Sequence, residues 1–394
     1  MAHIRTGSVN IPVQILGSTG SIGRQALDVA DRHGYRVLSL SACSNAAEVE
    51  KQARRYQVTS CAMTDVKAAQ LLKTALADTD IRVYAGAEGL CEMIRSFQNE
   101  KPVVLNAIAG EAGLLPSLAA LESGMDLALA NKETLVVAGP IVMETAKKHQ
   151  ARVLPVDSEH CAIWQCLNAG KRREVNKLIL TASGGPFFGK SAEELKTVTV
   201  RDALAHPTWH MGAQITVDSA TLMNKGFEIM EAAYLFSVDE SQIDVLVHKE
   251  SIVHSMVEFR DHSVIAQMSV PDMRFCIAHA IEYPHRNQAV IPPLSLSDVG
   301  TLHFAKPDTK TFPLLDQARK AYRTGGASGA VLNASNEVAV DAFLKEKIRF
   351  PEISDMISAV CDKLSGGRDV HTIEGILEYD ALARSETKNM IRHR

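Results

Sequence analysis

The chain has 394 residues, long enough for two or three domains, and its 46% hydrophobic and 22% charged residues are ordinary for a globular protein in water. A formal net charge of −4 argues against nucleic acid as a partner, and the lack of a bilayer-length apolar run or a secretory leader argues against a membrane. Seven scattered cysteines without a C-x-x-C pair favour reduced thiols in a cytoplasmic protein over a disulfide or zinc framework.

The first motif is a glycine-rich turn between a predicted strand and a predicted helix. The apolar run 11–16 leads into Gly17, Gly20 and Gly23, and helical spacing follows. Such glycines allow a tight turn and bring a pyrophosphate close to backbone N–H groups at a helix start. The motif predicts a dinucleotide site, although its G-x-x-G-x-x-G spacing is a variant. A glycine-rich turn without a ligand is the alternative.

The second predicted strand, 35–42, indicates which dinucleotide to expect. NAD enzymes often carry an acid at this strand end, where it binds the ribose hydroxyls. Here the strand is followed by Cys43, Ser44 and Asn45. The missing acid leaves room for a 2′-phosphate and favours NADP(H), although no Arg or Lys stands there to bind that phosphate.

Helical and strand-like segments then alternate as far as Gly110. This alternation predicts a parallel, doubly wound sheet. The turn from Gly110 to Gly113 and the tripeptide Asn131-Lys132-Glu133 both follow apolar strand-like runs, and such strand ends face the ligand crevice of an open sheet. A buried-turn role for Asn131 is the alternative.

Two carboxylates follow the apolar run VLPV. Residues 153–159 predict a strand, and because side chains alternate between its faces, Asp157 and Glu159 should point the same way. Such neighbours repel unless a cation or proton lies between them, and Glu228 is a candidate third acid. Three carboxylates predict an oxygen site for Mg²⁺ or Mn²⁺, whereas a solvated acidic strand end is the alternative. His160 is a candidate fourth ligand, but we interpret it as an exposed or core histidine.

The run 178–190 predicts a strand that ends in Ser183-Gly184-Gly185, and small side chains with open backbone amides suit an anion there. Residues 186–213 are polar and are interrupted by prolines and glycines. They predict a mobile lid with Trp209 as its apolar face. A Trp209 buried in a static core is the alternative.

Residues 206–231 begin with His206 in a predicted loop, because Pro207 and Gly212 interrupt any regular pattern. The run QITV (214–217) predicts a short strand. A helix is predicted from Ala220 onward, with Asp218 or Ser219 as its N-cap.

On that predicted helix Asn224 and Lys225 lie four and three residues before Glu228, so the three side chains share a face near the helix start. A helix N-terminus with a lysine, an asparagine amide and the hydroxyl of Ser219 predicts a phosphate site. An ordinary amphipathic helix with a solvated Lys–Glu pair is the alternative.

The remaining chain predicts strands over 243–271, where we interpret His248 and His254 as structural residues. The proline-rich stretch 283–313 has little periodicity and predicts an extended linker. Residues 314–394 have helical patterns without an acid cluster, and we interpret them as a structural cap.

Several stretches, in this order, resemble one family, the 1-deoxy-D-xylulose 5-phosphate reductoisomerases. They are GSTGSIG, ALANKETLV, VLPVDSEH, TASGGPF, HPTWHMG, VDSATLMNKGFE, VHSMVEF, PDMR and NASNEVAV. The resemblance runs over nearly the whole chain, and the DSEH and DSATLMNKG stretches are highly specific to the family.

The resemblance implies an enzyme of the non-mevalonate route to isoprenoid precursors. It would rearrange the sugar phosphate by retro-aldol and aldol steps and reduce the product with NADPH to 2-C-methyl-D-erythritol 4-phosphate. It implies Mg²⁺ or Mn²⁺, with Co²⁺ as a further candidate, and a cytoplasmic homodimer. The implied α/β architecture has an N-terminal Rossmann-like domain, a central α+β catalytic domain with a lid, a linker and a C-terminal helical bundle. These span 1–156, 157–290, 291–313 and 314–394.

The resemblance also implies roles for individual residues. The implied metal ligands are Asp157, Glu159 and Glu228, which with Lys225 and His206 form the catalytic set. The implied substrate contacts are Ser158, Glu159, Ser183, His206, Trp209, Ser219, Asn224, Lys225 and Glu228. The implied cofactor contacts are Thr19, Gly20, Ser21, Ile22, Ser44, Asn45, Asn131, Lys132, Glu133, Gly212 and Met273.

The chain departs from the family pattern in two places. Cys43-Ser44-Asn45 stands where the family often has Gly-Lys/Arg-Asn, which weakens the expected contact with a 2′-phosphate. His210 and Lys249 stand where we expect other residues.

Two other functions fit part of the sequence. A semialdehyde dehydrogenase can share the glycine-rich start, but it needs a catalytic cysteine, which would have to be Cys161 or Cys166. A redox-sensing NADP-binding module would need no catalysis. It would leave the three carboxylates and the phosphate site unexplained.

Overall fold

The computed structural model describes residues 10–209 and 211–394. The chain divides into two compact units. The first contains the chain up to Asn131 with Glu144–Asp157 and Asp272–Pro292. The second contains Lys132–Met143, Ser158–Pro271 and Pro293–Arg394. Among the helices of the described residues, none is both long and apolar enough to cross a membrane.

The first unit is built on a seven-stranded parallel sheet with the order β4-β3-β2-β1-β5-β6-β7. Its strands are β1 Pro12–Leu16, β2 Arg36–Ala42, β3 Ser60–Met63, β4 Arg82–Ala85, β5 Val103–Asn106, β6 Leu127–Leu129 and β7 Val153–Pro155. The strand order reverses its direction between β1 and β5, which is the position where open parallel sheets bind ligands.

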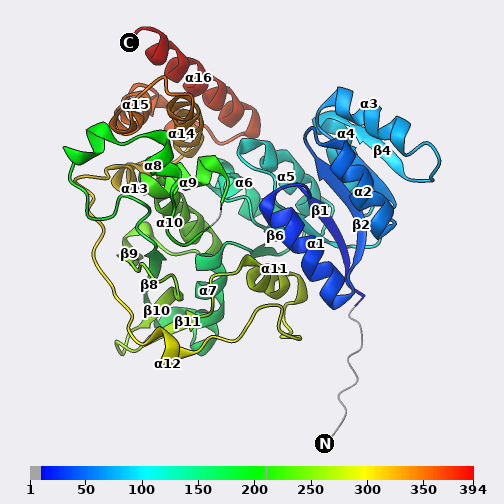
Figure 1. The fold of residues 1–394 in the computed structure, drawn as a ribbon, viewed down its shortest axis with the longest axis horizontal. Helices are drawn as coiled ribbons and strands as arrows, with labels where there is room; N and C mark the ends of the chain where they lie inside the picture. The colour runs from blue at the N-terminus through cyan, green and yellow to red at the C-terminus, as the bar shows by residue number, and fades with distance from the viewer. Residues whose placement is uncertain (1–9, 210) are drawn as a thin grey trace, which may run out of the picture. The chain divides into compact units, whose positions relative to one another are not determined.

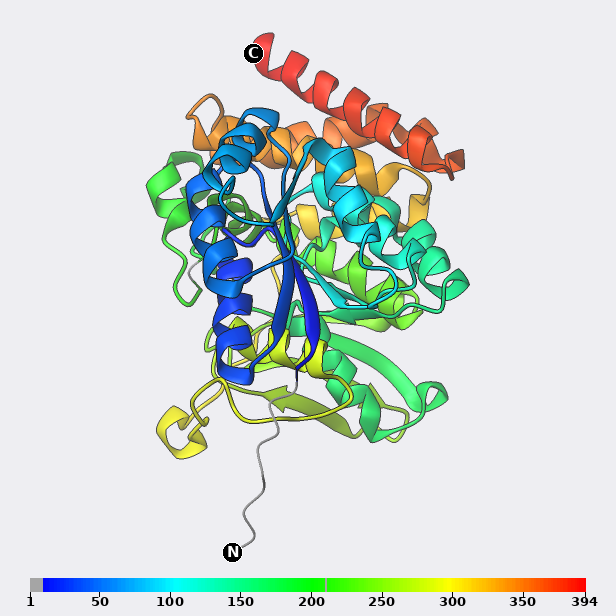
Figure 2. The same cartoon turned by 90° about the vertical axis from the view of Figure 1, so that its right-hand side faces the viewer.

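Helices cover both faces of this sheet. They are α1 Ser21–His33, α2 Ala46–Tyr56, α3 Val66–Ala75, α4 Gly86–Arg95, α5 Leu114–Glu122 and α11 Met273–Glu282, with a short 3₁₀ turn at Glu111–Gly113. The blue helices α1 and α2 lie on one side of the sheet and the cyan helices α4 and α5 on the other (Figure 2). The predicted doubly wound parallel sheet is therefore confirmed.

The second unit is built on a four-stranded mixed sheet with the order β11-β10-β8-β9. Its strands are β8 Val175–Ala182, β9 Ile243–Val247, β10 Val253–Phe259 and β11 Val264–Met268. Only β8 and β9 run parallel, and the other neighbours are antiparallel. The strands predicted over 243–271 are confirmed.

Helices make up most of the second unit. They are α7 Ser158–Cys166, α8 Val200–Leu204, α9 Ala213–Ala220, α10 Met223–Phe236, α12 Leu296–Val299, α13 Leu314–Thr324, α14 Ser328–Leu344, α15 Phe350–Lys363 and α16 Ile373–Arg392. Short 3₁₀ turns span Leu167–Ala169, Arg172–Glu174, Glu194–Thr197, Glu240–Gln242 and Ser365–Asp369. The last three helices pack together near the C-terminus (Figure 1). One apolar core joins this bundle to β8, α9 and α10, so the predicted C-terminal helical bundle is confirmed.

The helix α6, Glu133–Lys148, connects the two units along the chain. It contains Pro140, and the backbone of Ala138 is not helical. A proline inside a helix removes one backbone hydrogen bond and clashes with the preceding turn, which accounts for a kink at this place.

Two predictions of secondary structure were wrong. The run 214–217 is not a strand but part of α9, which begins after Gly212 and is stabilised by Thr216 Oγ1 donating to the Gly212 carbonyl at 2.9 Å. Packing against α8 and α14 overrides the β-propensity of the branched residues. Consequently Asp218 and Ser219 lie in the last turn of α9 and do not cap α10, because Leu222 in left-handed conformation separates the two helices.

The strand predicted over 153–159 ends early. β7 stops at Pro155, which has no N–H with which to continue the ladder, and α7 begins at Ser158. Asp157 therefore lies in the connection and Glu159 in the first helical turn, so the shared strand face was the wrong reason for bringing them together. The linker stretch is also less extended than predicted, because it contains α12 and Ala305 pairs with Val247.

Candidate functional site

The glycine turn of the first unit joins β1 to α1. Gly17 has a φ of +80°, and a Cβ there would lie 2.5 Å from the carbonyl oxygen of Ala107. A Cβ on Gly23 would overlap the backbone of Gly17 and Ser18. Gly20 is the N-cap of α1 and brings no side chain to its first turn. These features match the backbone approach that a pyrophosphate needs at a helix start.

The predicted contacts Thr19, Gly20, Ser21 and Ile22 all lie in this turn or in the first residues of α1. Ser18 joins the turn to α2, because its hydroxyl donates to Gln52 Oε1 at 2.7 Å. The turn is thus attached to α2 as well as to β1.

The end of β2 has the polarity expected from its sequence. Cys43, Ser44 and Asn45 are exposed, and no carboxylate occupies these three positions. Asn45 Oδ1 accepts from the backbone N–H of Glu48 at 3.2 Å, so this side chain caps α2. The hydroxyl of Ser44 is the remaining polar side chain of the three that could face a 2′-phosphate.

Asn131 stabilises a turn of the first unit. Its Nδ2 donates to the carbonyl oxygens of Ile108 at 2.6 Å and Gly110 at 2.8 Å. A Cβ on Gly113 would meet the Asn131 amide at 2.7 Å, so this glycine is required by close packing. These contacts support the buried-turn role that the sequence left open for Asn131, at the carboxyl end of the sheet.

In the second unit, the start of α10 holds a dense group of charges. Lys132 Nζ lies 2.8 Å from Asn224 Oδ1 and 3.1 Å from Glu228 Oε1, and Asn224 Nδ2 donates to the same Glu228 oxygen at 2.5 Å. Lys225 Nζ contacts Glu228 and lies 3.0 Å from Glu159. The side chains of Glu228 and Lys225 are 1% and 4% exposed, so this is a buried network. The solvated Lys–Glu pair is therefore excluded.

Three carboxylates meet at this network. One oxygen from each of Asp157, Glu159 and Glu228 lies within 4.8 Å of the others. Ser158 Oγ donates to Glu159 Oε2 at 2.5 Å and orients it. Oxygen donors at this spacing suit a hard divalent cation. The predicted set comes together although the predicted strand ends at Pro155, before the first of these carboxylates.

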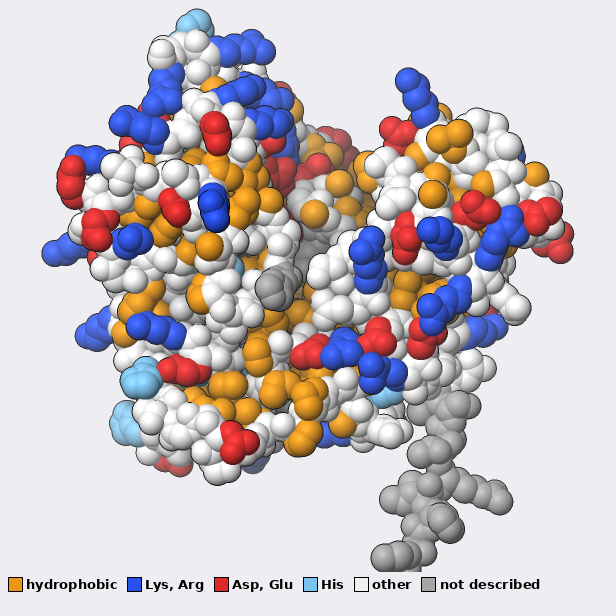
Figure 3. Space-filling view, in the orientation of Figure 1, with side chains coloured by type: hydrophobic (Ala, Val, Ile, Leu, Met, Phe, Trp, Pro, Cys, Tyr) orange, Lys and Arg blue, Asp and Glu red, His pale blue; other side chains and the backbone are white. Residues whose placement is uncertain are grey.

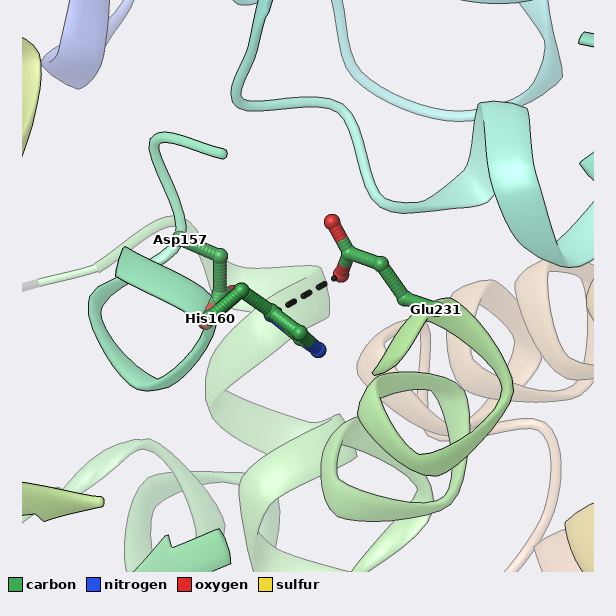
Figure 4. A group of neighbouring side chains, drawn as sticks. All are labelled: Asp157, His160 and Glu231. Carbon is green, nitrogen blue, oxygen red and sulfur yellow. Dashed lines mark ion pairs between the residues drawn. The ribbon is translucent and has the colours of Figure 1, made fainter. Parts of the chain in front are cut away.

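A second group shares Asp157 and includes His160 and Glu231 (Figure 4). His160 Nδ1 lies 3.3 Å from Glu231 Oε2, and its Nε2 lies 2.9 Å from the backbone oxygen of Glu228. His160 and Glu231 are fully buried. His160 is thus a core histidine, as interpreted, and it connects α7 to the helix that carries Glu228.

Ser183 and His206 form a polar pair beyond β8. Ser183 Oγ lies 2.9 Å from His206 Nε2, and His206 Nδ1 accepts from the backbone N–H groups of Trp209 at 2.9 Å and Thr208 at 3.2 Å. Because Nδ1 is an acceptor, the proton of the neutral ring is on Nε2 and is donated to Ser183. Burial lowers the pKa of His206 and favours this neutral form.

Ser219 lies beside the Ser183 turn. Gly185 has a φ of +65°, and a Cβ there would lie 2.7 Å from the carbonyl oxygen of Ser219. The turn therefore lies directly on the last turn of α9. The backbone of the turn that contains Ser183 thus contacts the backbone of the helix that contains Ser219, and both serines are predicted anion contacts.

The segment 186–213 is not a continuous loop, since it contains the 3₁₀ turn Glu194–Thr197 and α8. The Trp209 ring lies 6.3 Å from the ring of His254, and burial lowers the pKa of His254 to about 4. His210 is outside the described residues. Lys249 Nζ lies 4.9 Å above the ring of Phe188 in this segment.

Three further predicted cofactor residues lie at the starts of helices. Gly212 is the N-cap of α9 in the second unit, and Met273 is the first residue of α11 in the first unit. Glu133 is the first residue of α6.

The cysteine chemistry of a semialdehyde dehydrogenase is not supported. Cys161 and Cys166 are buried, and burial raises the pKa of Cys166 to about 11. A buried thiol of raised pKa is a poor nucleophile.

The sequence interpretation missed one residue near the site. Asn336 of α14 donates from Nδ2 to Asp218 Oδ1 at 2.8 Å, next to Ser219. Both side chains are buried. The signal was a run of polar residues, NASNE, within a predicted helix of the supposed cap, where buried amides need partners.

Three family models match consecutive parts of the chain. They describe 1-deoxy-D-xylulose 5-phosphate reductoisomerase at residues 13–139, its C-terminal domain at 153–236, and the DXP reductoisomerase C-terminal domain at 268–386.

Curated relatives match over almost their full length. The 1-deoxy-D-xylulose 5-phosphate reductoisomerase of Heliobacterium modesticaldum is 50% identical over 376 residues, covering 94% of this chain and 95% of the relative. That of Acetivibrio thermocellus is 47% identical over 380 residues, covering 96% and 99%.

Solved structures agree. A DOX-P reductoisomerase in complex with NADPH, fosmidomycin and magnesium has a TM-score of 0.92 and 39% identity, covering 97% of this chain and 98% of that chain. The Zymomonas mobilis enzyme in complex with NADPH has a TM-score of 0.90 and 38% identity, covering 97% and 99%. This chain belongs to the 1-deoxy-D-xylulose 5-phosphate reductoisomerase family.

Proposed function

We propose that this chain converts 1-deoxy-D-xylulose 5-phosphate into 2-C-methyl-D-erythritol 4-phosphate with NADPH and a divalent cation, in the supply of isoprenoid precursors. The observation that carries the proposal is the group formed by the half-buried Asp157 and Glu159 and the buried Glu228, beside Lys225 and Asn224. Glu159, Glu228, Lys225 and Asn224 belong to the second unit, and Asp157 directly precedes its Ser158 along the chain. The group combines a candidate cation site with a candidate anion site.

The donor set fits Mg²⁺ or Mn²⁺, with Co²⁺ as a further candidate. All three candidate ligands are carboxylates, and like charges this close, one of them buried, require compensating positive charge. Lys225 and Lys132 already supply part of that charge. When bound, the cation would stabilise negative charge on adjacent substrate oxygens, which retro-aldol and aldol steps require.

The substrate phosphate would be bound by Ser183, Ser219, Asn224 and Lys225. A phosphate that does not react can still supply binding energy that orients the reacting carbons. His206 would orient the Ser183 hydroxyl through its Nε2 proton. With unphosphorylated 1-deoxy-D-xylulose as the substrate, both kcat and affinity should therefore be lower than with the phosphorylated sugar. An equal kcat at saturation for the two substrates would contradict this assignment.

The contacts of Lys132 support an additional role. Its ammonium is hydrogen-bonded to Asn224 and close to Glu228, so we propose that it orients both side chains besides the predicted cofactor contact. The other predicted cofactor residues of the first unit belong to the glycine turn, the end of β2 and the Asn131 turn.

NADPH is the proposed reductant because the end of β2 has no acid at residues 43–45. Ser44 offers a hydroxyl rather than a cation, so we expect a moderate preference over NADH. A comparison of kcat/KM for the two cofactors tests this, and equal values would show that the interpretation of β2 is wrong.

We further propose that residues 186–213 close over the substrate, with Trp209 as the apolar face. Closure would exclude water from a reactive aldehyde. Limited proteolysis should cut this segment in the free enzyme and spare it with NADPH and a substrate analogue. Identical cleavage in both states would contradict a lid.

The proposed assembly is a cytoplasmic homodimer, with the chain divided functionally at 1–156, 157–290, 291–313 and 314–394. β11 is an edge strand, and its Val264 and Ile265 are 46% and 39% exposed. Hydrophobic side chains gather on the surface over this strand (Figure 3). An exposed apolar edge is a pairing surface. Light scattering should give twice the chain mass, and Ile265→Lys should lower it.

One assay tests the whole proposal. Absorbance loss of NADPH should require both 1-deoxy-D-xylulose 5-phosphate and a divalent cation, and excess chelator should stop it reversibly. No turnover under these conditions would favour a non-catalytic NADP-binding protein.

A further inference from the structure

The carboxylate of Asp218 is buried in the second unit and is hydrogen-bonded to two amides. Asn336 Nδ2 donates to its Oδ1 at 2.8 Å, and Gln214 Nε2 lies 3.4 Å from both oxygens. Gln214 belongs to the same helix, α9, whereas Asn336 belongs to α14 of the C-terminal bundle. Of the two hydrogen bonds, only the one from Asn336 therefore joins two different helices, α9 and α14.

Asp218 is also the residue before Ser219, whose hydroxyl is a proposed phosphate contact. Thr221 Oγ1 donates to the backbone oxygen of Asp218 at 3.2 Å and closes the last turn of α9. The Ser183–Gly185 turn lies against the backbone of Ser219. Any displacement of Asp218 would thus move Ser219 and the turn that carries Ser183.

The charge of Asp218 depends on the same contact. The pKa of Asp218 is raised to about 7. Burial is the largest cause and the nearby Glu133 also raises the pKa, whereas the hydrogen bonds from Asn336 and Gln214 and the charge of Lys132 lower it. The Asn336 amide therefore partly offsets the cost of burying the Asp218 carboxylate, besides attaching α9 to α14.

We infer that Asn336 is a positioning residue for the anion site: by holding Asp218 it fixes the turn of α9 that presents Ser219 beside Ser183. The inference rests on the proposed function only for the identity of the anion as the substrate phosphate. The C-terminal bundle, which the sequence suggested to be a structural cap, then takes part in substrate binding from a distance.

The test compares two asparagines of α14. Asn336→Leu removes the donor to Asp218. Asn333→Leu is the matched control, because Asn333 is equally buried but donates to Glu337 in its own helix. Binding of inorganic phosphate is measured by calorimetry, and KM is measured separately for the sugar phosphate and for NADPH.

Asn336→Leu should weaken phosphate binding and raise the KM of the sugar phosphate by about tenfold, which corresponds to about 1.4 kcal/mol. The KM of NADPH should stay unchanged, and Asn333→Leu should change neither constant. Equal effects of the two substitutions on phosphate binding would mean a merely structural role and would overturn the inference.

A charge exchange keeps the test decisive if Asn336→Leu does not fold. Asn336→Asp places two carboxylates face to face and should weaken phosphate binding most. Adding Asp218→Asn restores one amide donor and one carboxylate acceptor, and should return the affinity to within about threefold of wild type, a non-additive result. If the double variant is as weak as Asn336→Asp, the inference is wrong.

The outcomes separate this inference from the proposed function. If wild-type protein shows no turnover but the phosphate affinities follow this pattern, the positioning role stands and the proposed reaction fails. If wild-type protein turns over and the Asn336 variants bind phosphate normally, the positioning role alone fails.

Discussion

The glycine turn of the first unit and the charge cluster of the second unit are built in opposite ways. The turn uses consecutive residues, 17–23, and depends on side chains that are absent: a Cβ at Gly17 or Gly23 would overlap backbone. The cluster uses Glu159 of α7, side chains of α10 and Lys132, the residue before α6, and it depends on their charges. Substitutions in the glycine turn should therefore act through steric overlap with the backbone, whereas substitutions in the charge cluster should act through the loss of charge.

The largest expected effect is at the cluster. Glu228→Gln should lower kcat by at least about 1,000-fold, because a neutral amide replaces a charge that supplies several kcal/mol at the reacting oxygens. NADPH affinity and Trp fluorescence should stay close to wild type. Full activity of this variant, or of wild type with excess chelator, would contradict the cation site.

Glu231→Gln on the same helix is the matched control for that prediction. Glu231 belongs to the other carboxylate group, with His160 and Asp157. We expect lower stability with retained dependence on the cation. If instead Glu231→Gln abolishes cation dependence and Glu228→Gln does not, the cation binds to the group in Figure 4.

The next effect is on stability and concerns Asp218. Its pKa is raised to about 7 in the folded protein, whereas an unfolded Asp titrates near 4. Between about pH 4 and 7 the folded state therefore holds a proton on Asp218 that the unfolded state has lost. The stability that this proton contributes is fully present below about pH 4 and is lost as the pH rises towards 7. When the pH is raised from 5 to 8, the free energy of unfolding of wild type should fall by on the order of 3 kcal/mol more than that of Asp218→Asn.

Urea unfolding followed by Trp fluorescence measures this directly, because both tryptophans, Trp164 and Trp209, lie in the second unit. Asp355→Asn, which removes an exposed carboxylate of α15, is the control and should follow wild type. Parallel pH profiles for wild type and Asp218→Asn would contradict the raised pKa.

The glycine turn provides the contrasting test. Gly23→Ala should destabilise the first unit by about 2 kcal/mol through overpacking against Gly17 and Ser18. Gly20→Ala has room for its Cβ, whose nearest neighbour is at 3.4 Å, so it should keep stability and lose NADPH affinity. Hydrogen exchange of α1 and NADPH titration separate the two effects. Equal losses of stability would refute the distinction.

The smallest effect is expected at His206. Its neutral ring donates from Nε2 to Ser183, and burial keeps its pKa below the usual value. His206→Gln keeps a donor but changes its direction, so kcat/KM should fall by about tenfold. Because the ring is neutral in this range, wild-type kcat/KM should not fall through a change in the protonation of His206 as the pH rises from 7 to 8. A fall in that range would indicate that the charged form is needed.

Local features of the sequence predicted local structure well. The glycine turn, the missing acid after β2 and the parallel sheet followed from spacing, because each depends on neighbours in the chain. The strand predicted at 214–217 failed because the branched residues pack against α8 and α14, which lie outside any local pattern. Asp157 and Glu159 were paired correctly for a wrong reason, since β7 ends at Pro155.

The amino-acid sequence alone therefore determined the chemistry: which carboxylates, lysines and hydroxyls are present, and where the backbone has no side chains. Tertiary structure decided which of them meet. Lys132 and Glu228 are 96 residues apart in the chain, and Asp218 and Asn336 are 118 apart. Such contacts form because a buried charge must find a partner when water is removed, and only the packed fold decides which partner is within reach.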